Sequence, residues 1–121
     1  MDKKSITIEM MDHKGVFGEQ TFEVQRQGTP FQYQRDVMKL VRQHGEDLEL
    51  DIAVASLYFP KIIGKSRFLV EGINPDIKFT EILEEFFVND PFALSELVGE
   101  MGFFLSPALR IRSEKQEKMQ K

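Results

Sequence analysis

The histidines and carboxylates are the residues of this chain whose types could support catalysis or metal binding. The chain contains His13, His44 and 20 acidic residues, but no cysteine. His13 falls in a predicted loop, and His44 falls at a predicted helix end, where a cation suits the helix dipole. A lone histidine rarely acts without an acid or a nucleophile held beside it. We therefore interpret both histidines as surface residues.

Short motifs with a defined chemistry are not found in the sequence. It contains no HExxH or EF-hand pattern, and no glycine-rich loop follows a strand as phosphate binding requires. Its serines lack the strand-to-helix setting of a nucleophile elbow. The acidic pairs at residues 46–47 and 84–85 are typical of solvated helix faces and helix N-termini. The sequence therefore predicts no catalytic residue, no metal site and no cofactor.

Composition indicates a single folded domain with an acidic body and a basic end. A chain of 121 residues with 41% hydrophobic and 30% charged residues is ordinary for one globular domain. Residues 110–121 contain five basic and two acidic residues, so they carry +3 and the other 109 residues carry −7. The net charge of −4 argues against nucleic acid as the main partner. No apolar run is typical of a signal peptide or a membrane span, and the lack of cysteine fits the cytosol.

The elements that must position any site are predicted to be a β-hairpin and about four helices. Apolar residues alternate on both sides of Gly15, which predicts a hairpin over residues 5–26. The first helix is predicted to start after Thr29 as N-cap, with Gln32 completing a capping box, and to end at Gly45. Further helices are predicted over residues 46–59, 79–88 and 91–105.

The remaining segments are less regular. Residues 61–79 contain two glycines and an Asn-Pro pair, and their apolar residues favour either a short strand or a helix. Residues 110–121 are predicted to form a charged tail, either as a frayed helix or as disorder. A two-stranded hairpin is not stable alone. The sequence therefore predicts an α+β fold, in which the N-terminal hairpin packs on about four helices within a single domain at residues 1–109.

The helix predicted at residues 91–105 carries apolar residues on two sides. An arc of about 120° on the helical wheel, typical of a core-facing stripe, contains Leu94, Leu97, Val98, Met101, Phe104 and Leu105. The opposite side carries Phe92, Ser95, Gly99, Gly102 and Phe103. A glycine inside a helix costs about 1 kcal/mol relative to alanine, which suggests that another backbone approaches this side closely. Two interpretations remain open: a groove for a partner, or a central helix that its own chain covers on both sides.

A surface aromatic strip is the predicted binding site. Phe87 lies at the edge of the preceding predicted helix, about 100° from its core stripe. We predict that the strip consists of Phe87, Phe92 and Phe103. We predict that Ser95 and Gly99 form its floor. Such a groove would receive the apolar side chains of a partner helix.

Two short segments accompany the aromatic helices: NPDIKF at residues 74–79 and LSEL at residues 94–97. They follow the N-terminal hairpin and the capped first helix. In this order the segments resemble the tail assembly chaperones of siphophages, especially those of phages of lactococci and related Gram-positive hosts. The resemblance spans most of the chain, and it implies no catalytic residues.

The resemblance also implies a function and a partner. Members of this family coat the tape measure protein, a long, largely helical and apolar chain, and hold it soluble while tail-tube subunits polymerise around it. The resemblance implies self-assembly into larger homo-oligomers, action in the host cytoplasm and absence from the mature virion. Neither a membrane nor nucleic acid is expected as a partner.

Three other functions remain open. One is a small adaptor or regulatory protein that docks on another protein in a one-to-one complex. Another is a minor structural component of the tail or the connector. An enzyme is the least favoured, because it would need a buried polar pocket around His44 or around several carboxylates.

Overall fold

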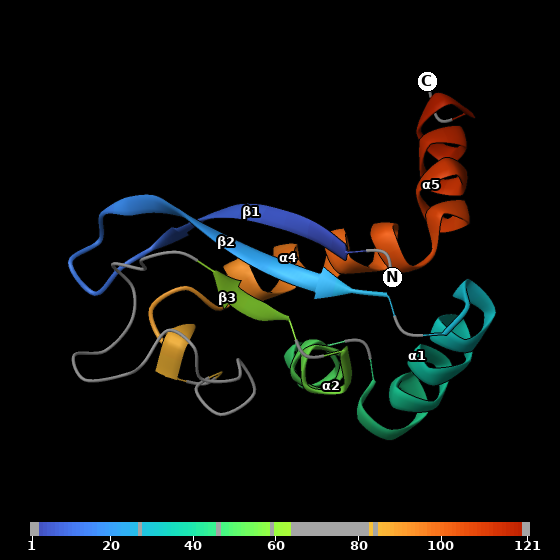
Figure 1. The fold of residues 1–121 in the computed structure, drawn as a ribbon, viewed down its shortest axis with the longest axis horizontal. Helices are drawn as coiled ribbons and strands as arrows, with labels where there is room; N and C mark the ends of the chain where they lie inside the picture. Colours follow the sequence, from blue (N-terminus) through green and yellow to red (C-terminus); the bar gives the residue numbers. More distant parts are fainter. Residues whose placement is uncertain are drawn as a thin grey trace.

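A three-stranded antiparallel sheet and four helices make up the part of the chain that the structure describes. The computed structural model describes residues 3–26, 28–45, 47–58, 60–63, 83 and 85–119. The strands, in the order β1-β2-β3, are β1 (Lys3–Met11), β2 (Phe17–Gln25) and β3 (Lys61–Ile63). The helices are α1 (Pro30–His44), α2 (Leu48–Tyr58), α4 (Pro91–Leu105) and α5 (Pro107–Met119) (Figure 1). The predicted α+β class is confirmed.

The hairpin forms because Asp12 holds its turn and its strands alternate in polarity. The backbone N–H groups of Lys14 and Val16 donate to Asp12 Oδ1 at 2.9 and 3.0 Å. Gly15 between them has a φ of 78°, a conformation that glycine adopts without the strain a Cβ would cause. From Ile6 onward every second residue of β1 is buried, which matches the period of a strand with one covered face. The predicted hairpin is confirmed.

The short strand β3 extends the hairpin and belongs to a segment that the sequence left open between strand and helix. It pairs antiparallel with β2, with Ile62 opposite Phe22, and both of these side chains are buried. A third strand adds the pairing that a lone hairpin lacks. Residues 64–82 and 84 lie outside the described residues, and they include half of the helix predicted at residues 79–88.

The helix α4 packs on the buried face of the sheet and is fixed at both ends (Figure 1). Asp90 Oδ1 accepts from the Ala93 N–H at 3.3 Å, and Asp90 Oδ2 accepts from the Met11 N–H at 3.0 Å. At the other end, Arg26 Nη2 donates to the Phe104 carbonyl at 2.6 Å, and the guanidinium lies 5.0 Å from the centre of that ring. Because Arg26 follows the end of β2, which pairs with the start of β1, α4 runs antiparallel to β1.

The helices α1 and α2 form a pair at the β3 side of the sheet. The predicted capping box begins α1: the Gln32 N–H donates to Thr29 Oγ1 at 3.2 Å, and the Thr29 N–H donates to Gln32 Oε1 at 2.8 Å. Gly45 follows the last residue of the helix with a φ of 78°. The rings of Tyr33 on α1 and Tyr58 on α2 meet edge to face, with centres 5.1 Å apart. Since α2 packs on α4, the tyrosine pair joins α1 to the rest of the domain.

The core is centred on Phe22 of β2. Its ring lies 5.8 Å from the ring of Phe86 and 6.2 Å from the ring of Phe87. Leu97 and Met101 of α4 are fully buried in the same cluster. The predicted core stripe of α4 is therefore correct for these residues.

The helix α5 occupies most of the segment that was predicted as a charged tail. It begins at Pro107, two residues after the end of α4, and extends to Met119. The helix therefore starts before the predicted domain end at residue 109. Among the described residues no single helix is long and apolar enough to cross a membrane, and α4 with residues 107–116 meets that length and composition only as a pair bent by 108°.

Candidate partner-binding surface

The first turn of α4 carries a highly exposed aromatic ring. The Asp90 cap and Pro91 begin the helix, so that Phe92 stands in its first turn. Phe92 is 82% exposed, whereas the two residues that follow it are buried. Three turns further along the same side, Phe103 is half-buried. Phe92 therefore lies on the surface, and its role in binding stays a prediction.

Phe87 is not on the surface, where the sequence placed it. It is 5% exposed, and its ring stacks on Phe22 and meets the ring of Phe86 at 5.0 Å. The chain turns at residues 87–89 instead of continuing a helix, and β2 covers the ring. The predicted surface position of Phe87 is therefore wrong, because a strand from elsewhere in the chain packs against that side.

An apolar hollow of about 330 Å³ lies between α2 and the start of α4. Its lining consists of Leu48, Ile52, Leu83, Phe87, Val88, Pro91 and Leu94. Val88 is 70% exposed and Leu48 is 45% exposed, so the rim of the hollow is apolar as well as its floor. The buried Phe87 side chain is part of this lining.

A second hollow of about 380 Å³ lies on the other side of Pro91, between the hairpin and α4. Glu9, Met11, Phe17, residues 89–93 and Glu96 line it. Phe17, at the start of β2, is 58% exposed. We use the term α4 N-terminal surface for the apolar residues around the two hollows, which are Phe17, Leu48, Val88, Pro91 and Phe92. The α4 N-terminal surface is acidic on its hairpin side, because three carboxylates line the second hollow: Glu9, Asp90 and Glu96.

The small residues on the outer side of α4 differ in their surroundings. Ser95 Oγ donates to Asp51 Oδ2 of α2 at 2.6 Å. A Cβ added to Gly99 would meet nothing within 4 Å, whereas a Cβ added to Gly102 would lie 3.0 Å from Tyr33 Oη. The close approach that two glycines suggested is therefore made at Gly102 by the chain's own helix α1. Gly99 is open.

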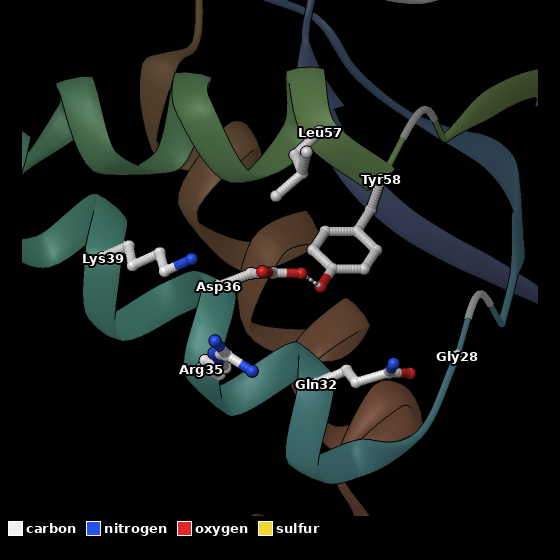
Figure 2. A pocket seen from close by; sticks show the side chains of 7 residues that line it. All are labelled: Gly28, Gln32, Arg35, Asp36, Lys39, Leu57 and Tyr58. Atoms are coloured by element: carbon white, nitrogen blue, oxygen red, sulfur yellow. Dashed lines mark hydrogen bonds between the residues drawn. The ribbon is translucent and has the colours of Figure 1, made fainter.

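A polar pocket between α1 and α2 was not predicted from the sequence (Figure 2). It has a volume of about 370 Å³ and is lined by Gly28, Gln32, Arg35, Asp36, Lys39, Leu57 and Tyr58. The Tyr58 hydroxyl donates to Asp36 Oδ2 at 2.9 Å. Burial, together with this hydrogen bond, raises the pKa of Tyr58, so the phenol stays neutral. The pair joins two helices. Gln32, Arg35, Asp36 and Lys39 of the lining lie at the i, i+3, i+4, i+7 spacing of one helix face, a signal that sequence analysis could have used.

The histidines lie away from these hollows. His13 is exposed in the hairpin turn, and His44 Nδ1 lies 4.0 Å from Glu49 Oε2 near the end of α1. Within the described ranges, no group of three or more His, Asp or Glu side chains is placed to hold a metal ion.

The fold and these surfaces define a small α+β protein with an exposed apolar surface at the start of one helix. Contiguous apolar surface of this kind is typical of proteins that bind another chain. Comparisons of the chain with protein-family models, with curated proteins and with solved structures gave no match. Its function therefore has to be inferred from the surface and its chemistry.

Proposed function

We propose that this chain is a non-catalytic tail assembly chaperone of the siphophage type. It binds apolar helical segments of the tape measure protein through the α4 N-terminal surface and keeps that protein soluble during tail assembly. It acts in the host cytoplasm, associates with further copies of itself and is left out of the mature virion.

The exposure of Phe92 beside a pair of hollows that share Pro91 is the observation that supports this proposal best. A helix that docks on a groove inserts apolar side chains spaced by three or four residues. The hollows of about 330 and 380 Å³ on either side of Pro91 would accept such side chains, and Phe92 lines the second of them. Removing one phenylalanine side chain from water contributes about 1.5–3 kcal/mol. A single ring therefore accounts for roughly a tenfold to hundredfold change in affinity.

Co-expression with a tape measure fragment that contains apolar helical segments tests the proposal. The wild-type chain is expected to keep the fragment in the soluble fraction, and Phe92→Ser is expected to lose most of this effect. Phe31→Ser is the matched control, because Phe31 on α1 is 75% exposed and lies outside both hollows. If Phe92→Ser holds the fragment as well as Phe31→Ser does, the α4 N-terminal surface is not the binding site.

Two further measurements separate binding from folding. Phe92→Ser changes a side chain with few contacts, so its free energy of unfolding is expected to stay within about 0.5 kcal/mol of wild type. Phe17→Ser removes a ring from the hairpin side of the same surface, and it is expected to weaken fragment binding without touching α4. Mass spectrometry of purified virions distinguishes a chaperone from a minor tail component, since only the latter would be found there.

A further inference from the structure

The outer edge of β1 offers a long row of backbone hydrogen-bonding groups. β1 has nine residues, and in the part of the chain that the structure describes it pairs only with β2. Exposed edges of this length readily pair with another strand, and proteins usually block them. The charges along β1 indicate which strand would pair with this edge.

The hydrogen bonds at the hairpin turn show which residues of β1 direct their backbone groups outward. The Asp12 N–H donates to the Val16 carbonyl, in the same register that pairs Met10 with Gly18. Because paired and outward positions alternate in an antiparallel ladder, the even-numbered residues bond to β2 and the odd-numbered residues point away. The outward Met11 N–H is already used, since it donates to Asp90 Oδ2 at 3.0 Å. The open edge therefore consists of Lys3, Ser5, Thr7 and Glu9.

We propose that this edge pairs antiparallel with the same edge of a second copy of the chain, about a two-fold axis at Ile6. This register places Lys3 opposite Glu9 of the second copy, and Ser5 opposite Thr7 of the second copy. In this register each of the four outward residues pairs with an outward residue of the second copy. A register shifted by two residues would leave at least one of the four without such a partner. The result is a continuous six-stranded sheet with an isologous interface, the commonest symmetry of protein dimers.

Charge complementarity selects the antiparallel arrangement. The basic residues Lys3 and Lys4 stand at the start of β1, and Glu9 stands near its end. Antiparallel pairing brings the basic start of each strand to the acidic end of the other, whereas parallel pairing in register would place like charges side by side. Lys3 remains 56% exposed in its side chain despite its contact with Glu23 at 3.8 Å, so it can reach a second carboxylate.

The face of the sheet that carries α4 shows the same complementarity. Lys4 is exposed and, in the proposed register, lies opposite Ile8 of the second copy. Glu96 of α4 lines the same hollow as Glu9, so this carboxylate stands on the β1 side of α4. Lys4 of one copy would therefore approach the acidic flank of α4 in the other.

A proline substitution tests the edge directly. Thr7→Pro removes an outward N–H and leaves the bonds from β1 to β2 in place. Thr7→Val is the matched control, because both variants lose the hydroxyl contact between Thr7 and Thr21 at 2.9 Å but only the proline loses the N–H. Sedimentation velocity of the full chain over rising concentration is expected to give a dimer for wild type and Thr7→Val. For Thr7→Pro, with unchanged circular dichroism, the dimer is expected to be at least about tenfold weaker.

Charge reversal tests the register. Lys3→Glu and Glu9→Lys are each expected to weaken the dimer by roughly tenfold, and the double variant is expected to restore it. An equal mixture of the two single variants is expected to form a mixed dimer. A wild-type chain that stays monomeric, a dimer that tolerates Thr7→Pro, or a double variant that is no better than the single ones would overturn the proposal. The proposal deepens the self-association named above and does not depend on the client, so fragment co-solubility remains a separate test of function.

Discussion

Alanine at Gly99 and alanine at Gly102 are expected to change the stability of the protein in opposite directions. Both glycines lie inside α4, so intrinsic helix propensity favours alanine by about 1 kcal/mol at each position. Their surroundings differ, because a Cβ at Gly99 meets nothing within 4 Å. We therefore expect Gly99→Ala to raise the free energy of unfolding by about 0.5–1 kcal/mol.

At Gly102 the propensity gain is opposed by a steric contact. An added Cβ would lie 3.0 Å from Tyr33 Oη and 3.6 Å from Leu109 Cδ2. Tyr33 is 5% exposed and packs edge to face against Tyr58, so its ring has little room to move away. Overpacking of a close-packed site costs about 1–3 kcal/mol. Gly102→Ala is therefore expected to lower the free energy of unfolding by up to about 2 kcal/mol.

Urea denaturation followed by circular dichroism measures both effects, with the free energy extrapolated to zero denaturant. Tyr33→Phe removes the hydroxyl that limits Gly102, so the double variant with Gly102→Ala is expected to be more stable than the two single effects added together. A stabilising effect of Gly102→Ala equal to that of Gly99→Ala would refute the steric argument. A destabilising Gly99→Ala would show that another group packs against this side of α4.

Two further predictions concern groups that hold the fold together. Burial raises the pKa of Tyr33 from 10.0 to about 12. The stability that the protein gains from burying this neutral phenol is therefore complete below pH 10 and is lost as the pH rises through about 12. Across this pH range the free energy of unfolding is expected to fall by roughly 2–3 kcal/mol, and by less in Tyr33→Phe. Asp90→Ala removes both a helix cap and the partner of the Met11 N–H, so it is expected to lower the free energy of unfolding by about 1–3 kcal/mol. Asp47→Ala is the control, because it removes only a helix cap, and its effect is expected to be smaller. Equal losses in the two aspartate variants would show that the Met11 contact adds nothing.

Sequence reasoning found the elements whose signals are local. The capping box consists of Thr29 and Gln32, which lie three positions apart. Such signals act on the backbone directly, so they can be recognised without knowledge of tertiary packing. The alternation in the hairpin is equally local, since period two requires only one covered face.

Sequence reasoning failed where burial depends on a distant segment. The helical wheel gives the direction of a side chain, but it does not say how many neighbours surround the helix. Phe87 is covered by Phe22 of β2, and Gly102 is approached by Tyr33 of α1. The helical wheel placed Phe87 and Gly102 outside the core stripes because it does not include these distant segments. Phe92 and Gly99 were placed on the same outer side, and among the described residues nothing covers them.

The direction of the Phe92 ring depends on the residue that joins the hairpin to α4. Asp90 accepts one hydrogen bond from the first turn of α4 and another from the end of β1. Phe92 follows two residues later, and Phe17 lies on the hairpin side of the same hollow. A partner that contacts both rings therefore binds across this joint, and it binds only when the sheet and α4 are docked. Such a partner stabilises the folded domain by mass action. Asp90 therefore links the exposed surface to the sheet, in addition to the packing of α4 on the core.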